Sequence, residues 1–214
     1  MSHHAKIKTT WAACTSALVL TGALTAMPTV AQNPATTAKV TFPAELNWEA
    51  MPVVTFDFSP WVSGTPAERK LAAKIWRKEL DAIPTAEFQG RVKKYPAFIL
   101  LGASEDGAHR YIFSGLSAAS VAYPLCEDPP NGGDEHTSTW ANCPMRVVIQ
   151  NKETGVEHQE QFPDYCLQYS YGSDRPFAEN HTEFAFDNKT KTAYFRVLQY
   201  GKHVPACDRA IRLQ

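Results

Sequence analysis

Four cysteines in the second half of the chain constrain its fold more than any other feature. They are Cys126, Cys143, Cys166 and Cys207. An even number suits disulfides in an oxidising compartment, and four cysteines allow three pairings. We predict Cys126–Cys143, which would close a loop rich in turn-forming residues, and Cys166–Cys207, which would join a central segment to the C-terminal one. A metal site is the weaker interpretation, because no Cys-x-x-Cys or close Cys/His spacing occurs.

The first 31 residues have the three parts of an export signal. Residues 1–8 carry two lysines and no acid, residues 11–26 are mostly apolar, and residues 29–31 are small enough for a cleavage site. This order is typical of a signal peptide. The apolar run is short and polar for a membrane span, so a retained anchor is the less favoured alternative. We expect a periplasmic or secreted protein with no stable membrane span after cleavage.

Composition and charge narrow the classes of partner. The chain has 214 residues, of which 20% are charged and 44% hydrophobic, as in ordinary globular proteins. Cleavage after Ala31 would leave 19 basic and 22 acidic residues, a formal charge of −3. No basic run stands out, so we expect no nucleic-acid partner, since such binding depends on neutralising phosphates. The predicted organisation is a signal peptide over 1–31, a flexible lead-in over 32–45 and a single domain over 46–214.

Helical periodicity is strongest over residues 65–83. Thr65-Pro66-Ala67-Glu68 has the pattern of a capping box, with proline at the first helical position. Apolar residues at helical spacing follow, with basic residues on the other side, so we predict one amphipathic helix that ends at Pro84 and lies on a sheet. The apolar stripe consists of Leu71, Ala72, Ile75, Trp76, Leu80 and Ile83.

The rest of the chain favours β-structure, because short runs of β-branched and aromatic residues are separated by turn formers. We expect strands within 46–58, 97–101, 110–113, 121–125, 145–150, 156–161, 165–171, 182–186, 191–198 and 210–213. Hairpin turns are expected at 104–107, 151–155 and 187–190. One good helix, several strands and no regular β-α-β order predict an α+β fold. It would be a mostly antiparallel sheet with one amphipathic helix packed on it, stapled by disulfides.

The segment between Cys126 and Cys143 contains the candidate binding residues. Its Pro-Pro and Gly-Gly pairs exclude regular structure. A disulfide at its base would reduce the entropy lost when a partner orders the loop. We predict that this loop binds a partner, with Trp140 as the anchor and the acidic residues giving electrostatic selectivity. A surface loop kept soluble by its charges is an equally favoured alternative. The candidates are Glu127, Asp128, Asp134, Glu135, His136 and Trp140.

The same loop has a less favoured interpretation as a Ca²⁺ site. Its oxygen ligands would come from Asp128, Asp134 and Glu135, with His136 beside them. Their spacing matches no EF-hand or repeat pattern. We therefore expect no metal and no cofactor.

A search for catalytic patterns finds one constellation. Glu179, His181 and Glu183 alternate, so they would share one strand face as an acid–base or metal-binding group. Charges on an exposed strand face are the simpler explanation. Ser117 lacks the following glycine of a nucleophile elbow, and no zinc helix or phosphate loop occurs. The aromatic segment 165–177 suits an interface, although a core strand followed by a polar turn is the commoner explanation.

These observations favour binding over catalysis. We expect an exported, non-catalytic domain that binds another protein of the cell envelope or exterior, as an enzyme inhibitor or an immunity-type protein. A periplasmic or secreted hydrolase of envelope polymers is one alternative. An accessory subunit of an envelope assembly is the other.

Overall fold

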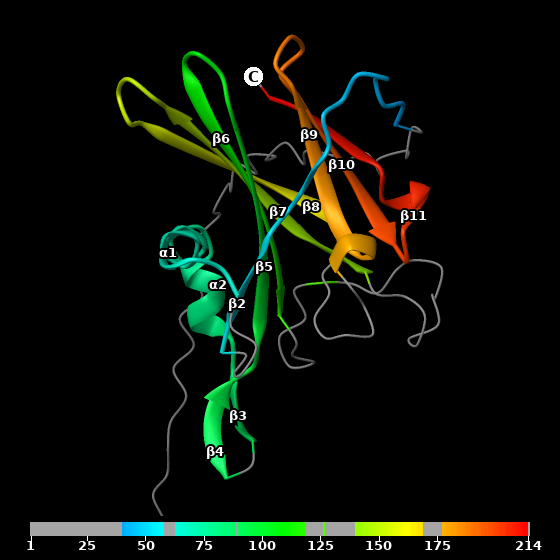
Figure 1. Cartoon of the computed structure of the whole chain (residues 1–214). Coiled ribbons are helices and arrows are strands. Elements are labelled where there is room, and N and C mark those ends of the chain that lie inside the picture. The colour runs from blue at the N-terminus through cyan, green and yellow to red at the C-terminus, as the bar shows by residue number, and fades with distance from the viewer. Residues whose placement is uncertain are drawn as a thin grey trace, which may run out of the picture. The chain divides into compact units, whose positions relative to one another are not determined.

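Two antiparallel sheets account for most of the computed structural model (Figure 1). The structure describes residues 40–57, 63–88, 90–118, 126, 140–168 and 177–213. All of them belong to one compact unit, Thr37–Gln214. Within the described part of the chain, no helix is long and apolar enough to cross a membrane.

The first sheet, which we call the central sheet, has five strands in the order β2-β5-β6-β7-β8. Their bounds are Val53–Phe56, Ala97–Glu105, His109–Ala118, Trp140–Asn151 and Glu157–Gln168. Residues 97–101 were predicted as a strand buried on both faces, and these residues of β5 are buried. Alternate side chains of β5 enter two different hydrophobic clusters, one on each face of the sheet.

The second sheet, the outer sheet, is built on the hairpin of β9 (His181–Asp187) and β10 (Thr192–Gln199). The short strands β1 (Glu49–Ala50), β11 (Lys202–His203) and β12 (Arg209–Arg212) complete it. The β9–β10 hairpin is the predicted one, and its turn contains Lys191 in the left-handed region at φ 54°. Two single-turn 3₁₀ helices, η1 (Phe177–Glu179) and η2 (Pro205–Cys207), flank these strands.

Aromatic rings fill the space between the sheets. Phe113 of the central sheet lies 5.5 Å from Phe184 and 5.5 Å from Phe195 of the outer sheet, measured between ring centroids. Tyr165 stacks edge-on against Phe195 at 5.4 Å. Gly102 allows this close approach, because a Cβ at that position would lie 2.9 Å from the Phe184 ring. The alternating apolar residues of β9 therefore face a second sheet.

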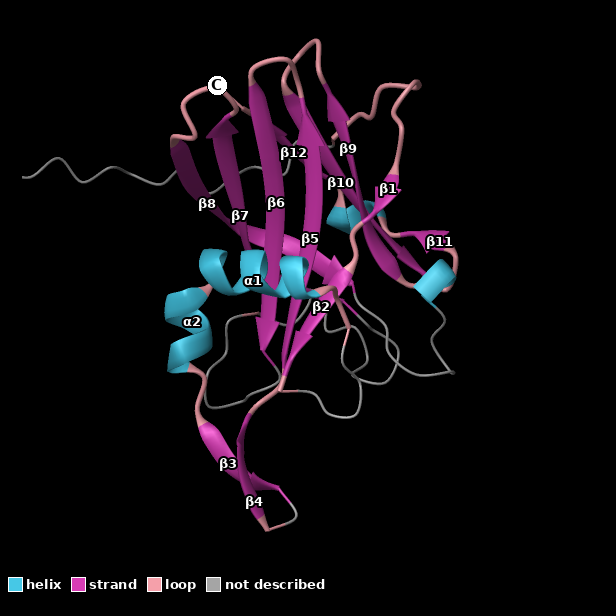
Figure 2. Cartoon of the chain, turned by 60° about the vertical axis from the view of Figure 1, so that its left-hand side comes forward, coloured by secondary structure: helices cyan, strands magenta, loops and turns pink. Residues whose placement is uncertain are grey.

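Helices cover the opposite face of the central sheet (Figure 2). The predicted single helix is two, α1 (Pro66–Ile75) and α2 (Arg77–Ala82), interrupted at Trp76 with φ −112° and ψ 22°. The break has a long-range cause, because the Arg146 guanidinium from β7 donates to the Ile75 carbonyl at 2.6 Å and caps α1. The predicted capping box is confirmed, with reciprocal Thr65 and Glu68 hydrogen bonds of 2.6 and 3.2 Å.

A third, two-stranded sheet was not predicted. It is the hairpin of β3 (Thr85–Phe88) and β4 (Arg91–Lys94), which pairs with neither main sheet and extends away from both (Figures 1 and 2). Only Gln89 and Gly90 separate the strands, and Gly90 has φ 73°, which favours glycine.

The chain is thus mostly antiparallel sheet with few helices and two disulfides, and sheet predominates more than an α+β fold with one helix implies. Several predicted strands were too short, because β6, β7 and β8 run for 10 or 12 residues and β8 absorbs the start of the 165–171 strand. The predicted 46–58 strand is divided into β1 and β2 around Pro52. The predicted strand at 121–125 lies outside the described residues.

Candidate functional site

The predicted cysteine pairs are both disulfides in the structure. Cys126 and Cys143 have their Cα atoms 4.2 Å apart. Cys143 is 1% exposed and belongs to the core between the sheets, and the Cys126 Sγ lies 3.5 Å from the Leu116 carbonyl oxygen of β6. The bond therefore ties the residue that precedes the predicted loop to β7, which begins at Trp140, inside the segment predicted to be irregular.

Five of the six predicted binding residues cannot be placed. Glu127, Asp128, Asp134, Glu135 and His136 lie outside the described residues, and their role stays a prediction. The Ca²⁺ interpretation of the same residues is likewise untested. Within the described part of the chain, no three His, Cys, Asp or Glu side chains gather as metal ligands.

Trp140, the sixth predicted binding residue, begins β7 and is half-buried. It packs against the cluster of Cys166, Cys207 and Val197, which surrounds the second disulfide. Much of its surface is thus used within the domain. Its predicted part as an anchor for a partner remains a prediction, and its substitution would disturb the packing around this disulfide.

Both disulfides lie where β7 begins and β8 ends. Asn142 of β7 is directly opposite Cys166 of β8, and Cys143 is opposite Tyr165. The Cys166–Cys207 bond then crosses to η2, which precedes β12 of the outer sheet. Two covalent links thus fasten the strands next to the 127–142 segment, and we call this region the disulfide end.

The β3–β4 hairpin extends from the same end of the central sheet. Its second strand leads through Pro96 into Ala97, the first residue of β5. Ala97 is opposite Phe56 at the end of β2 and Ala118 at the end of β6. The segments that follow β2, β6 and β8 therefore all leave the central sheet at the end that carries the hairpin.

The constellation predicted from Glu179, His181 and Glu183 is only partly assembled. His181 and Glu183 share a face of β9, with His181 Nε2 3.2 Å from Glu183 Oε1. Glu179 is exposed in η1. The expectation of an exposed charged face is wrong for the pair, whose side chains are 8% and 12% exposed.

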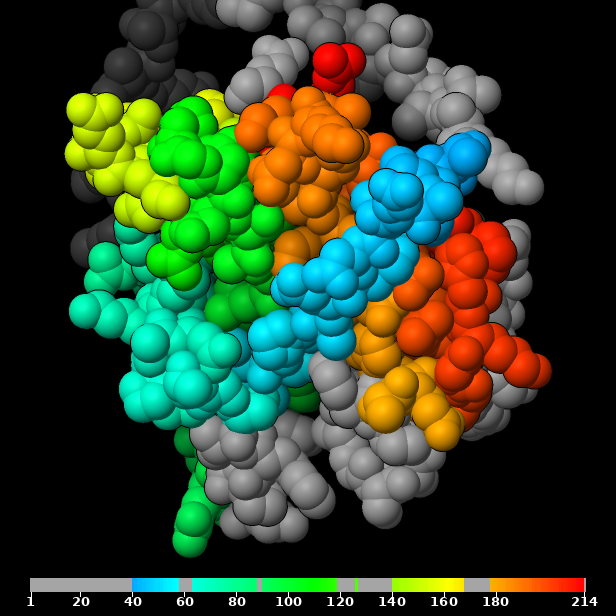
Figure 3. All heavy atoms as spheres, turned by 45° about the horizontal axis from the view of Figure 1, so that its top comes forward, coloured from blue at the N-terminus to red at the C-terminus, as the bar shows by residue number. Residues whose placement is uncertain are grey.

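Glu183 lies between two side chains, His181 and Arg196, and an aromatic ring stacks on the second of them. Its other oxygen accepts a 2.5 Å hydrogen bond from Arg196 Nε of β10, directly opposite in the sheet. The Arg196 guanidinium stacks at 4.1 Å on Trp48, which belongs to the N-terminal segment 40–48. In Figure 3 this segment, in blue, forms a band across the surface beside the orange and red strands. These contacts bind the segment to the outer sheet.

Asp106 forms a second polar centre, at the turn between β5 and β6. One carboxylate oxygen accepts from the backbone N–H groups of Ala108 and His109 at 2.8 and 2.6 Å, and the other from the Tyr111 hydroxyl at 2.8 Å and from Lys191 Nζ. The Lys191 bond and the backbone donors hold the pKa of Asp106 well below its ordinary value. Burial, with the Asp106 bond and charge, raises the pKa of Tyr111 to about 12. Asp106 and its partners thus join the β5–β6 turn to the β9–β10 turn.

The aromatic residue that begins segment 165–177 is a core residue. Tyr165 is 6% exposed and packs against Phe195, and its burial raises the pKa of its hydroxyl. Tyr169 and Tyr171 lie outside the described residues. The described part of this segment therefore matches the core-strand explanation.

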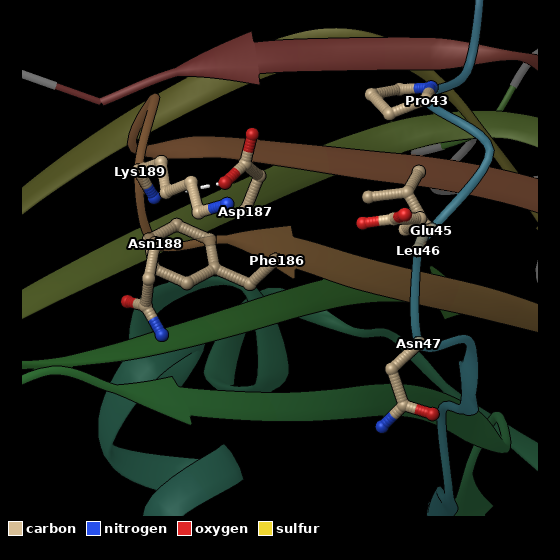
Figure 4. Close-up of a pocket in the computed structure, with 8 residues that line it drawn as sticks. All are labelled: Pro43, Glu45, Leu46, Asn47, Phe186, Asp187, Asn188 and Lys189. Carbon is tan, nitrogen blue, oxygen red and sulfur yellow. Dashed lines mark hydrogen bonds between the residues drawn. The ribbon is translucent and has the colours of Figure 1, made fainter.

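A pocket of about 400 Å³ lies between the N-terminal segment and the β9–β10 turn (Figure 4). One of its polar groups, the Asp187 carboxylate, is engaged in hydrogen bonds of its own turn. Asp187 accepts from the Thr190 hydroxyl and from the backbone N–H of Lys189, each at 2.8 Å, and these bonds lower its pKa. Pro43, Leu46 and Phe186 add apolar walls. The carboxylate is used to form the turn.

The β3–β4 hairpin is the feature of this end that sequence reasoning missed. The signal that could have found it is Gln89-Gly90 between two short runs containing threonine, phenylalanine or valine.

No family model matches the chain, and no curated protein or solved structure is significantly similar to it.

Proposed function

We propose that the chain is an exported, non-catalytic domain that binds another protein of the envelope or exterior through its disulfide end, as an enzyme inhibitor or immunity-type protein. The observation that carries this proposal is the Cys126–Cys143 bond. It closes the predicted acidic binding loop on a base with a Cα separation of 4.2 Å, and one of its cysteines is buried in the core.

Such a base favours binding for an entropic reason. A loop with tethered ends samples fewer conformations when free, so less entropy is lost when a partner orders it. The loop sequence adds four acids and a histidine, which would select a basic partner surface at that loop. The second disulfide fixes the neighbouring end of β8, so the loop is presented from a rigid support.

The clustered ionisable groups give less support to a hydrolase. Both oxygens of Glu183 are used by His181 and Arg196, and both oxygens of Asp106 accept hydrogen bonds from neighbouring backbone and side-chain groups. These arrangements suit structural carboxylates better than an acid–base pair facing a substrate. Among the described residues no further strand pairs with the edges of the β3–β4 hairpin, which favours a second candidate, an accessory subunit of an envelope assembly.

Two disulfides and the finding that no described helix could cross a membrane are consistent with an extracellular or periplasmic location. Cleavage after Ala31 and the choice between periplasm and exterior belong to the proposal.

The test is capture by the mature chain from an exported-protein extract, quantified by mass spectrometry. The loop variant is Asp134→Ala with Glu135→Ala, because replacing Trp140 would also disturb the packing around Cys166. The control is Glu153→Ala, an exposed acid in the turn after β7. A protein partner should be recovered with the wild type and the control, and reduced about tenfold with the loop variant. Equal recovery with all three chains would exclude the loop as the site.

A further inference from the structure

We propose that the β3–β4 hairpin is a docking element that accepts an acidic, extended segment of a partner protein as an added strand along β4. This inference rests on the proposed function in that the partner is a protein. It concerns a surface different from the 127–142 loop, and it specifies the chemistry of the segment that binds there.

The hairpin is anchored at its base and unsupported beyond it. Tyr95 N donates to the Pro84 carbonyl at 3.2 Å, Lys94 Nζ donates to the Leu80 carbonyl at 2.7 Å, and Ile83 is buried under the helices. Within the part of the chain that the structure describes, the paired residues beyond that base join no larger sheet. A two-stranded hairpin alone is marginally stable in water, so a third strand would stabilise this one.

The pairing register shows which backbone groups are free to bind. Residues of an antiparallel pair alternate between bonding to each other and pointing their N–H and C=O groups outward. The bond between Tyr95 and Pro84 fixes this alternation. Val92 opposite Glu87, and Lys94 opposite Thr85, are then the outward-pointing pairs. Val92 and Lys94 therefore present backbone donors and acceptors along β4, as strand addition requires.

The charge of the hairpin selects the partner. Its ten residues contain three basic side chains, Arg91, Lys93 and Lys94, and one acid, Glu87. Arg91 and Lys93 are exposed, and neither has an ion pair or side-chain hydrogen bond within the described residues. The mature chain as a whole has an excess of acids, so this arm differs from its surroundings. These positive charges repel a second copy of the hairpin and attract an acidic strand.

Val92 gives the same edge an apolar contact. It is 75% exposed, the highest value among the large hydrophobic residues of the described chain. A β-branched residue on an added strand could pack beside it as a cross-strand neighbour. The expected ligand is therefore a segment that alternates acidic with β-branched residues.

The test measures binding of a short synthetic peptide that alternates glutamate with valine to the purified mature chain, by fluorescence anisotropy. Matched peptides carry lysine in place of glutamate, or N-methyl groups on alternate amides. The proposal predicts binding of the acidic peptide alone, since lysine reverses the charge and N-methylation removes strand hydrogen bonds. Absence of binding, or equal binding of the N-methylated peptide, as a simple polyanion site would give, overturns it.

Variants of the chain locate the site. Val92→Pro removes the outward N–H without breaking a bond inside the hairpin and should weaken binding about tenfold, whereas Val92→Thr should not. Arg91→Glu with Lys93→Glu should weaken it at least as much, whereas Lys202→Glu in β11 should not. Unchanged binding by Val92→Pro refutes strand addition. This assay needs no natural partner, so a chain that captures a protein through the 127–142 loop but ignores the peptide refutes the hairpin proposal alone.

Discussion

Cys166 at the end of β8 is bonded to Cys207 in η2, so one covalent bond links the central sheet to the outer sheet. Its sequence separation is 41, against 17 for Cys126–Cys143. The chain-entropy model gives about 4 kcal/mol for the longer loop and about 3 kcal/mol for the shorter. Replacing Cys166 and Cys207 by alanine should thus lower the free energy of unfolding in urea more than replacing the other pair. An equal or smaller loss would contradict the assigned role.

The indole of Trp76 donates a 2.8 Å hydrogen bond to the Ser114 hydroxyl at the buried helix–sheet interface. Ser114→Ala leaves that N–H without its acceptor, so we expect a loss of about 1–3 kcal/mol in the free energy of unfolding. Ser104→Ala, on the same sheet but half-buried, is the matched control and should change little. Equal losses in the two variants would show that the hydrogen bond contributes nothing specific.

Asp106 should make the stability of the domain sensitive to acid. Its pKa is lowered in the folded state, first by the Lys191 bond, so its contribution is present above the unfolded pKa, about 4. It is lost as the pH falls below that value toward the folded pKa. The difference in Tm between the wild type and Asp106→Asn should be constant at neutral pH and shrink below about pH 4. A difference that does not vary with pH would refute this role.

Substitution of Glu183 tests whether its carboxylate has a structural or a catalytic role. Glu183→Gln removes a charge from between His181 and Arg196, so we expect a loss of about 2 kcal/mol in stability, measured by urea unfolding. Glu179→Gln, at an exposed carboxylate, should leave stability unchanged. If Glu183→Gln instead kept full stability and abolished hydrolysis of an envelope polymer, the hydrolase alternative would regain support.

Local patterns predicted the elements whose signals are local. Thr65 and Glu68 form the capping box that their spacing indicates, and the β9–β10 hairpin follows from alternation around a polar turn. The break at Trp76 was not predictable, because it depends on Arg146, 70 residues away, whose hydrogen bond to the preceding residue spans 71 positions. The alternation of apolar residues in β9 predicts a strand with one buried face. It does not indicate whether a helix or a second sheet packs against that face.

The difference between local sequence signals and long-range contacts also explains how much of the candidate site could be predicted. The disulfide pairing was chosen among three because one pair would close a turn-rich loop and the other would tie a central segment to the C-terminal one, and the structure confirms it. Burial of His181 and Glu183 did not follow, because Glu183 pairs with Arg196 of the next strand, and Arg196 stacks on Trp48, which is distant in the sequence. The β3–β4 hairpin was overlooked because its strands have four residues each and polar side chains on both faces.

The proposed function depends on export into an oxidising compartment, where both disulfides would persist. Its most direct test is the intact mass, measured without reduction, of the protein isolated from the cells that produce it, with its N-terminal residue determined. We predict a chain that begins at Gln32 and is lighter by four hydrogens than its reduced form, because two disulfides are present. A chain that begins at Met1 with every cysteine as a free thiol would contradict it.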